Sequence, residues 1–374
     1  MAEKTYLAID MGASSGRHVV GRFDGRKISL EEIHRFGNGP VDMGGSLYWD
    51  FPGLWQEVVA GLRKAYDAVG NSVASIGVDT WGVDFGLLGP RDEILGLPYC
   101  YRDSRTAGIF DTAFKTVSRA EIFRHTGLQF MEFNTLFQLI AMRQGRHPSL
   151  DAATTLLQMP DLFHWLMTGE KVNELTNATT TQFYNPIERR WAVELFEQFN
   201  LPRTILGDLV QPGTDIGMLR ESLRNETGLK AAHVVVPGTH DTASAVMAVP
   251  AASIPGEQPN WCYISLGTWA LMGLETPSPV VNDHVMKLNF TNEGGVGNTT
   301  RLLKNICGMW ILQECRRVWN QSGKSYDWRD LTAMAAEADP LVSFINPDAP
   351  EFAAPTDMPA AIRQYCLRTG QMVP

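Results

Sequence analysis

The first 34 residues constrain the fold of this chain more than any other segment. They contain three short apolar runs separated by tight turns, as expected for β-strands. The second turn contains Asp24-Gly25, a dipeptide that is strongly favoured in hairpins. The predicted strands are residues 5–10, 17–23 and 27–34. The chain is therefore expected to begin with β-hairpins.

A helical pattern follows at residues 50–70. Asp50 can cap this helix, and Pro52 suits its first turn. Its apolar side chains recur every four residues, at Leu54, Val58, Leu62 and Tyr66. Strands are predicted again at residues 75–89 and 94–99. The order of strands, helix and strands indicates an α/β fold.

The rest of the chain suggests a second, related half. Helical patterns dominate residues 105–230, and a strand pattern at 233–238 precedes another helix. A Pro/Gly-rich stretch at about 250–260 is typical of a domain boundary. We therefore expect one domain at residues 1–250 and another at 251–374. The second begins, like the first, with a strand, a Gly-containing turn and a strand.

Charge and composition exclude several classes of protein. Of the 374 residues, 32 are Lys or Arg and 41 are Asp or Glu, so the net charge is −9 and no basic face for nucleic acid is expected. No apolar run is long enough to span a membrane, and no secretory signal is recognisable. Five scattered cysteines fit a reducing cytoplasm. We therefore expect a cytoplasmic protein. Because no heptad pattern is visible, we expect a monomer or a weak homo-oligomer.

The turn of the first hairpin is a candidate phosphate-binding loop. Its small residues let backbone N–H groups approach phosphate oxygens, while two hydroxyls and a guanidinium add donors. These residues are Ala13, Ser14, Ser15, Gly16 and Arg17. Asp10, at the end of the preceding strand, could hold a hydrated Mg²⁺. The same residues also fit an ordinary hairpin turn, because neither GxxxxGK[ST] nor GxGxxG is present.

Two further motifs fit phosphoryl transfer. Thr268, in the turn of the second expected hairpin, could contact phosphate from the other half, although such a turn is commonly structural. Asp241 lies in the string THDT, after a strand and at the start of a helix. It could act as a general base toward a hydroxyl that attacks phosphorus, or it could simply cap the helix.

A fourth motif fits the recognition of a polyhydroxylated ligand. The string DTWGVD at residues 79–84 places Trp81 among carboxylates, and YRDSR follows at 101–105. Aromatic faces pack on sugar C–H groups while polar groups take the hydroxyls, but Trp81 fits a core position equally well. Asn177, its neighbouring threonines and Asn305 are further candidates for reading hydroxyls.

Taken together, these motifs resemble the FGGY family of carbohydrate kinases, and within it the kinases that act on L-rhamnulose. The similarity runs in family order from the N-terminus to about residue 315. It rests on AIDMGASSGR, EIHRFGNG, IGVDTWGVDFGLL, LPYCYRDSRT, NTLFQL, TNATTTQ, HDTASAV, SLGTWALMG, TNEGG and LLKNICGMWILQ. The resemblance implies an actin-like ATPase domain (ribonuclease H-like) fold, with two domains around a cleft.

The resemblance also implies roles for individual residues. Asp241 is similar to the family's catalytic base, and the implied reaction transfers phosphate from ATP, with Mg²⁺, to L-rhamnulose, giving L-rhamnulose 1-phosphate. The implied sugar contacts are Gly82, His240, Asp241, Thr242 and Asn305. The implied ATP contacts are Ala13 through Arg17, Thr268 and Gln313.

The family pattern continues beyond the point that matches Pro374, through a Gly-rich turn of the adenine pocket. On that pattern the second domain is expected to be incomplete and to lack this turn. Two alternatives stay open. One is a truncated sugar-binding remnant or pseudokinase, and the other is a kinase of a related ketose such as L-fuculose.

Overall fold

The computed structural model describes residues 3–251, 257, 259–267, 269–352 and 355–374, and within them the chain forms two compact units. The first unit comprises Met1–Asn260 and Glu275–Leu302, and the second comprises Trp261–Leu274 and Leu303–Pro374. Strands β16 (Trp269–Thr276) and β18 (Thr300–Cys307) each continue from one unit into the other. The division expected at residues 250/251 stays a prediction. Each unit is described by itself.

A six-stranded mixed sheet forms the centre of the first unit, with strand order β13-β14-β6-β1-β2-β3. Strands β1, β2 and β3 are antiparallel neighbours, whereas β6 runs parallel to β1 and to β14. The strands are β1 (Lys4–Met11), β2 (Ser15–Phe23), β3 (Ile28–Gly37), β6 (Val73–Thr80), β13 (Asp215–Met218) and β14 (His233–Val235). The three predicted N-terminal strands are therefore confirmed.

Helix α1 (Phe51–Val69) follows the sequence prediction closely. The Asp50 side chain accepts a hydrogen bond from the Gly53 N–H, and Pro52 lies in the first turn. The helix buries Leu54, Val58, Leu62 and Ala65, whereas Tyr66 is exposed. Tyr66 lies outside the buried face. A strict four-residue spacing drifts around a helix that has 3.6 residues per turn, so the fourth residue of the series turns toward solvent.

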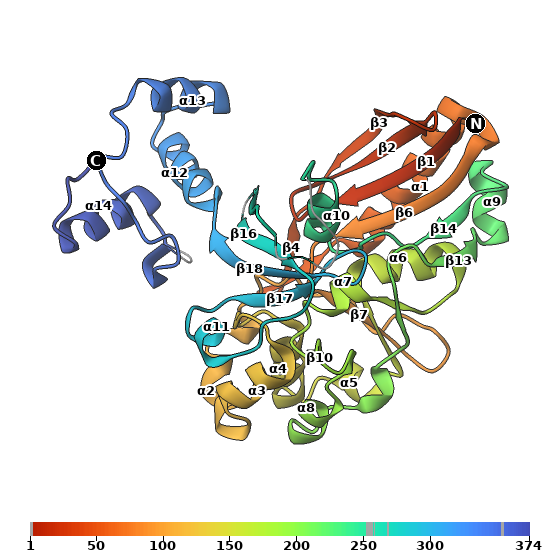
Figure 1. Cartoon of the computed structure of the whole chain (residues 1–374), viewed down its shortest axis with the longest axis horizontal. Helices are drawn as coiled ribbons and strands as arrows, with labels where there is room; N and C mark the ends of the chain where they lie inside the picture. The colour runs from red at the N-terminus through yellow and green to blue at the C-terminus, as the bar shows by residue number, and fades with distance from the viewer. Residues whose placement is uncertain (1–2, 252–256, 258, 268, 353–354) are drawn as a thin grey trace. The chain divides into compact units, whose positions relative to one another are not determined.

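The sheet and its helices enclose the main core, to which β1, β6, α1 and α6 contribute fully buried side chains. Figure 1 shows α2, α3, α4, α5 and α8 gathered in a separate group within the first unit, and their apolar side chains form a second core. The helices of the first unit beyond α1 are α2 (Ile109–Thr116), α3 (Arg119–Thr126), α4 (Thr135–Gln144), α5 (Pro148–Ala152), α6 (Met159–Thr168), α7 (Leu175–Ala178), α8 (Val193–Gln198), α9 (Glu221–Thr227), α10 (Asp241–Met247) and α11 (Asp283–Lys287).

Several two-stranded sheets lie outside the six-stranded sheet. They are β4 (Pro40–Met43) with β5 (Ser46–Trp49), β7 (Phe85–Leu88) with β8 (Thr155–Gln158), β9 (Asn173–Glu174) with β12 (Leu209–Val210), and β10 (Tyr184–Asn185) with β11 (Arg190–Trp191). Strand β17 (Thr291–Gly294) also belongs to this unit. The strand predicted at residues 94–99 is wrong, because Ile94 and Tyr99 form only isolated bridges. Gly96, with φ +88°, interrupts the extended conformation there.

The second unit begins with the predicted hairpin, formed by β15 (Tyr263–Leu266) and β16. Three helices follow: α12 (Trp310–Gln321), α13 (Trp328–Glu337) and α14 (Met358–Arg368). A small core of Cys315, Ala349, Phe352 and Met358 lies among them. Within the described part of the chain, no helix has the length and apolar character needed to cross a membrane.

Candidate active site

Three carboxylates from separate elements of the first unit interact with one another. Asp10 lies near the end of β1, directly opposite Asp79 in the parallel register with β6. Asp241 opens α10. Burial raises the pKa of Asp79 well above its usual range, and the charges of Asp10 and Asp241 raise it further. The sheet therefore concentrates negative charge at the ends of two neighbouring strands.

The predicted phosphate loop is shorter than expected. Gly16 and Arg17 already belong to β2, and the Gly12 N–H donates to the Ser15 carbonyl across the turn, 2.9 Å away. Gly16 is needed for packing, because a Cβ there would lie 2.2 Å from the Phe36 ring. Ser14 is exposed, and Ala13 and Ser15 are half-buried. The turn itself thus spans residues 12–14.

Arg17 pairs with Asp10 across the hairpin. Its Nε and Nη2 lie 2.9 and 2.8 Å from Asp10 Oδ2, and both side chains are partly exposed. This ion pair contributes little to stability because solvent screens it. It does bring the predicted phosphate-binding guanidinium next to the predicted metal-binding carboxylate.

The segment that carries Asp241 is anchored to β6 and to a buried carboxylate. The Thr80 N–H donates to the Thr239 carbonyl at 2.9 Å. Glu174, fully buried at the end of β9, accepts hydrogen bonds from the backbone N–H and hydroxyl of Thr239 and of Thr176. Burial raises the pKa of Glu174, and these four donors oppose that shift. Glu174 therefore holds the start of α10 against α7.

Asp241 itself has a raised pKa. Burial is the main cause, and the charge of Asp10 adds to it, whereas His240 and the hydrogen bonds from Thr242 act in the opposite direction. Asp241 Oδ1 accepts hydrogen bonds from the Thr242 N–H at 2.5 Å and the Thr242 hydroxyl at 3.1 Å. A carboxylate with a raised pKa is a stronger base, so this environment suits proton abstraction.

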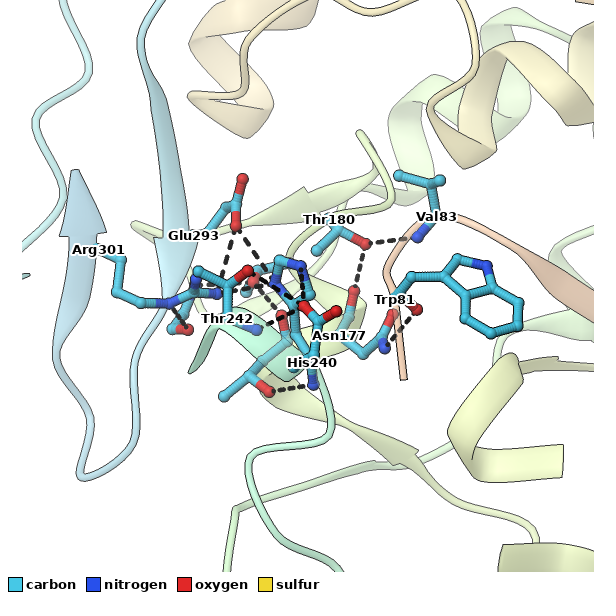
Figure 2. A network of polar contacts seen from close by, with 12 residues as sticks. Trp81, Val83, Asn177, Thr180, His240, Thr242, Glu293 and Arg301 are labelled. Carbon is cyan, nitrogen blue, oxygen red and sulfur yellow. Dashed lines mark hydrogen bonds and ion pairs between the residues drawn. The ribbon is translucent and has the colours of Figure 1, made fainter. Parts of the chain in front are cut away.

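His240 joins Asp241 to a buried ion pair. Its Nε2 lies 3.6 Å from Asp241 Oδ1, and its Nδ1 lies 3.0 Å from Nη2 of Arg301 and 3.4 Å from Oε2 of Glu293. Arg301 on β18 is fully buried and pairs with Glu293 on β17 at 3.3 Å. Figure 2 shows these three side chains pointing toward one another.

Gly82 adjoins a set of hydrogen bonds that leads to the Asp241 segment. A Cβ at this position would approach Thr180 Oγ1 to 3.0 Å, and that oxygen accepts a hydrogen bond from the Val83 N–H at 3.1 Å. Asn177 Nδ2 lies 3.5 Å from the carbonyls of both Trp81 and Thr239. Figure 2 shows this connection from the Trp81–Val83 loop toward His240. The structure thus brings together Gly82, His240 and the Asp241 segment.

Trp81 belongs to the core. It is 6% exposed, its ring centroid lies 4.2 Å from that of Trp49, and both indole N–H groups donate to Asp84 Oδ2. Burial raises the pKa of Asp84 to about 6 despite these bonds. Of the two roles that fitted Trp81 in the sequence, the structure favours the core position.

The remaining predicted site residues lie in the second unit. Asn305 on β18 and Gln313 on α12 are both half-buried. Thr268 lies outside the described residues. No group of three or more His, Cys, Asp or Glu side chains suited to a metal is found in the part of the chain that the structure describes. Mg²⁺ commonly takes one or two carboxylates together with waters and phosphates, so Asp10 and Asp79 fit it chemically.

Sequence analysis missed three residues of this site. Glu174, Glu293 and Arg301 are all nearly or fully buried and hold the Asp241 segment. Glu174 adjoins the string TNATTTQ and Glu293 lies within TNEGG, so both occur at motifs that were already recognised. The sequence offered no sign that these charges are buried.

Comparison with known proteins agrees with this architecture. A xylulose kinase from Lactobacillus acidophilus superposes with a TM-score of 0.76 at 15% identity, over 90% of this chain and 66% of that one. Plasmodium falciparum glycerol kinase with ADP gives 0.68 at 12% identity, over 90% and 67%. At such low identity the likeness establishes the fold alone: the α/β fold of sugar kinases.

Sequence relatives identify the family. The models for the N- and C-terminal domains of the FGGY carbohydrate kinases match residues 5–248 and 262–373. The chain belongs to the FGGY family of carbohydrate kinases. It is 45% identical to a rhamnulokinase of Bacteroides thetaiotaomicron, over 100% of this chain and 75% of the relative. A rhamnulokinase of Bacillus subtilis is 37% identical, over 99% and 74%. The chain thus spans about three quarters of these relatives and about two thirds of the solved structures.

Proposed function

We propose that this chain phosphorylates L-rhamnulose with ATP, giving L-rhamnulose 1-phosphate and ADP. The rhamnulokinase relatives, at 37–45% identity over 98–100% of the chain, support this substrate over L-fuculose and over an inactive remnant. The observation that carries the proposal is the placement of Asp241. It is a carboxylate with a raised pKa, next to His240 and within the electrostatic influence of Asp10.

In the proposed reaction, Asp241 accepts the proton of the ketose O1 hydroxyl as that oxygen attacks the γ-phosphorus. A new O–P bond forms, the bond between the γ-phosphorus and the bridging oxygen breaks, and its electron pair leaves with ADP. Bound Mg²⁺ would neutralise phosphate charge, with Asp10 and Asp79 as the carboxylates that hold it. His240, Thr242, Gly82 and Asn305 would position the sugar.

The ATP contacts are proposed for both units. Residues 13–17, with the Arg17 guanidinium, form the first phosphate contact, and Thr268 and Gln313 supply contacts from the other unit. In this assignment residues 1–250 carry the base, the first phosphate loop and most of the sugar contacts, while residues 251–374 contribute the second phosphate contact and Asn305. The five cysteines, scattered without a CxxC pair, support placing the protein in the cytoplasm.

The decisive experiment compares Asp241→Asn with Asp283→Asn in a coupled ADP-release assay. Each residue is the first of a short helix, α10 or α11, but Asp283 is exposed and has none of the roles assigned to the site residues. Loss of the base should lower kcat by about 10²–10⁴-fold. L-Rhamnulose affinity, measured by calorimetry, should change little, and the control should retain full activity.

A substrate panel of L-rhamnulose and L-fuculose tests the substrate. A wild-type preference for L-fuculose would contradict the proposed substrate, and equal loss of binding and turnover in Asp241→Asn would contradict the base role. Sugar binding without any ADP release would favour the remnant.

A further inference from the structure

Arg301 reaches the candidate site from β18, one residue before the motif LLKNICGMWILQ begins. Its side chain is fully buried, its Nε donates to the Gly294 carbonyl at 2.9 Å, and its Nη2 lies 3.0 Å from Nδ1 of His240. Two contacts made by one planar group fix the guanidinium in orientation. Arg301 therefore presents a fixed donor to one particular atom of the imidazole.

This contact determines where the imidazole carries its proton. A guanidinium has only N–H donors and stays charged in proteins, so the Nδ1 atom facing it must act as the acceptor. In the neutral ring, a bare Nδ1 leaves the proton on Nε2. The ring is therefore held in one tautomer, with its N–H on the side of Asp241.

We infer that Arg301 is a positioning residue that acts through His240, holding it as the Nε2–H tautomer so that it donates a hydrogen bond to a hydroxyl of the ketose. Nε2 lies 3.6 Å from Asp241 Oδ1, which is longer than a hydrogen bond and leaves this N–H able to donate to a ligand oxygen. The identity of that ligand rests on the proposed function. The tautomer itself does not.

Glu293 balances the positive charge of the Arg301 guanidinium. Its Oε2 lies 3.3 Å from Arg301 Nη2 and 3.4 Å from His240 Nδ1. The competing arrangement would place a proton on Nδ1, pointing at Glu293. That proton would then face the N–H groups of Arg301 at the shorter distance of 3.0 Å, so the guanidinium contact opposes it.

The first test reads the tautomer directly, by ¹⁵N NMR of histidine-labelled wild-type protein at neutral pH without substrate. His240→Gln identifies the His240 signals by their disappearance. The spectrum contains its own reference, because Nε2 of buried His164 accepts the Val78 N–H at 3.2 Å and that ring must carry its proton on Nδ1. His240 should show the opposite pattern. An Nδ1–H or doubly protonated His240 would overturn the inference.

The second test measures the consequence for the sugar. Because loss of Arg301 alone leaves Glu293 buried without its cation, both variants also carry Glu293→Gln: Arg301→Met removes the donor, whereas Arg301→Gln keeps an amide donor and serves as the rescuing variant. Loss of one oriented hydrogen bond should raise KM for L-rhamnulose about 10-fold, with kcat within about twofold and KM for ATP unchanged. Arg301→Gln should restore most of the affinity.

An unchanged KM for L-rhamnulose in the Arg301→Met, Glu293→Gln variant, or a fall in kcat alone, would contradict the positioning role. Failure of the wild-type chain to phosphorylate any ketose would instead count against the proposed function. The NMR result would still stand, because it needs no substrate.

Discussion

Asp79 on β6 lies directly opposite Asp10 on β1 in the parallel register of the two strands. Successive residues of a strand point to opposite faces, so register partners such as these point to the same face of the sheet. Burial raises the pKa of Asp79, the charges of Asp10 and Asp241 raise it further, and the Arg17 guanidinium opposes them. A divalent cation would relieve this repulsion.

Magnesium should therefore stabilise the isolated chain, even without nucleotide. At 10–100 times its Kd, Mg²⁺ should raise the free energy of unfolding by about 1–3 kcal/mol, and EDTA should reverse the effect. Asp10→Asn should abolish the shift in a thermal denaturation assay. Asp67→Asn, an exposed carboxylate on α1, should leave it intact. Equal stabilisation of Asp10→Asn would show that the cation binds elsewhere.

Replacing Glu174 by Gln should loosen the start of α10. The carboxylate accepts four hydrogen bonds from Thr176 and Thr239, and an amide NH₂ facing those donors cannot accept. The variant should lose about 2–3 kcal/mol of stability, measured by urea denaturation. Because Thr239 precedes His240 and Asp241, kcat/KM should fall as well. Glu170→Gln, an exposed position after α6, is the matched control and should change neither quantity.

Local sequence signals predicted the elements that depend on local interactions. The Asp24-Gly25 turn and the Asp50 cap are decided by neighbouring residues, so the first three strands and α1 appear where the sequence places them. The expected strand at residues 94–99 failed for the opposite reason. Its apolar side chains fit a buried strand, but Gly96 adopts a positive φ and no continuous partner pairs with the segment.

Gly82→Ala should weaken sugar binding without unfolding the chain. The added methyl group would lie 3.0–3.2 Å from three atoms of Thr180, which accepts the Val83 N–H and donates to the Asn177 carbonyl. Relieving this overpacking displaces Thr180 and the Val83 N–H, so KM for L-rhamnulose should rise about 10-fold, while the free energy of unfolding should fall by no more than about 1–3 kcal/mol.

Gly39→Ala is the control for this change. A Cβ at Gly39 meets nothing within 4 Å, and KM should not change. An unaltered KM in Gly82→Ala would remove this loop from the sugar site, whereas a large loss of stability would show that the glycine serves packing instead.

The site illustrates which features a sequence leaves hidden. The strings around Asp10, Gly82 and Asp241 were recognisable, but the groups that hold them were not. In the sequence, nothing distinguishes Arg301 from the exposed charged residues of other turns. In the structure it is fully buried against His240. Burial and partner choice arise from contacts between segments about 60 residues apart, which no local pattern encodes.

Acid should destabilise the chain through two buried histidines. His18 on β2 has its pKa lowered to about 3 by burial and by the charges of His34 and Lys64, and burial lowers that of His164 on α6 to about 3. In the unfolded chain both would titrate near 6.5, so unfolding takes up protons as the pH falls below that value. Stability is therefore full above about pH 6.5 and falls by about 1.4 kcal/mol per pH unit for each histidine on the way down to about pH 3.

The contribution of His18 can be separated by comparing the free energy of unfolding in urea at pH 6.5 and pH 5. His18→Leu should lose about 1.7 kcal/mol less than wild type over this interval, whatever its stability at neutral pH. The packing cost of the change is the same at both pH values, because a leucine does not titrate, so the difference isolates the proton linkage. His284→Gln, an exposed position on α11, should keep the wild-type slope. If His18→Leu keeps that slope too, His18 is protonated within the folded protein and its burial does not control acid stability.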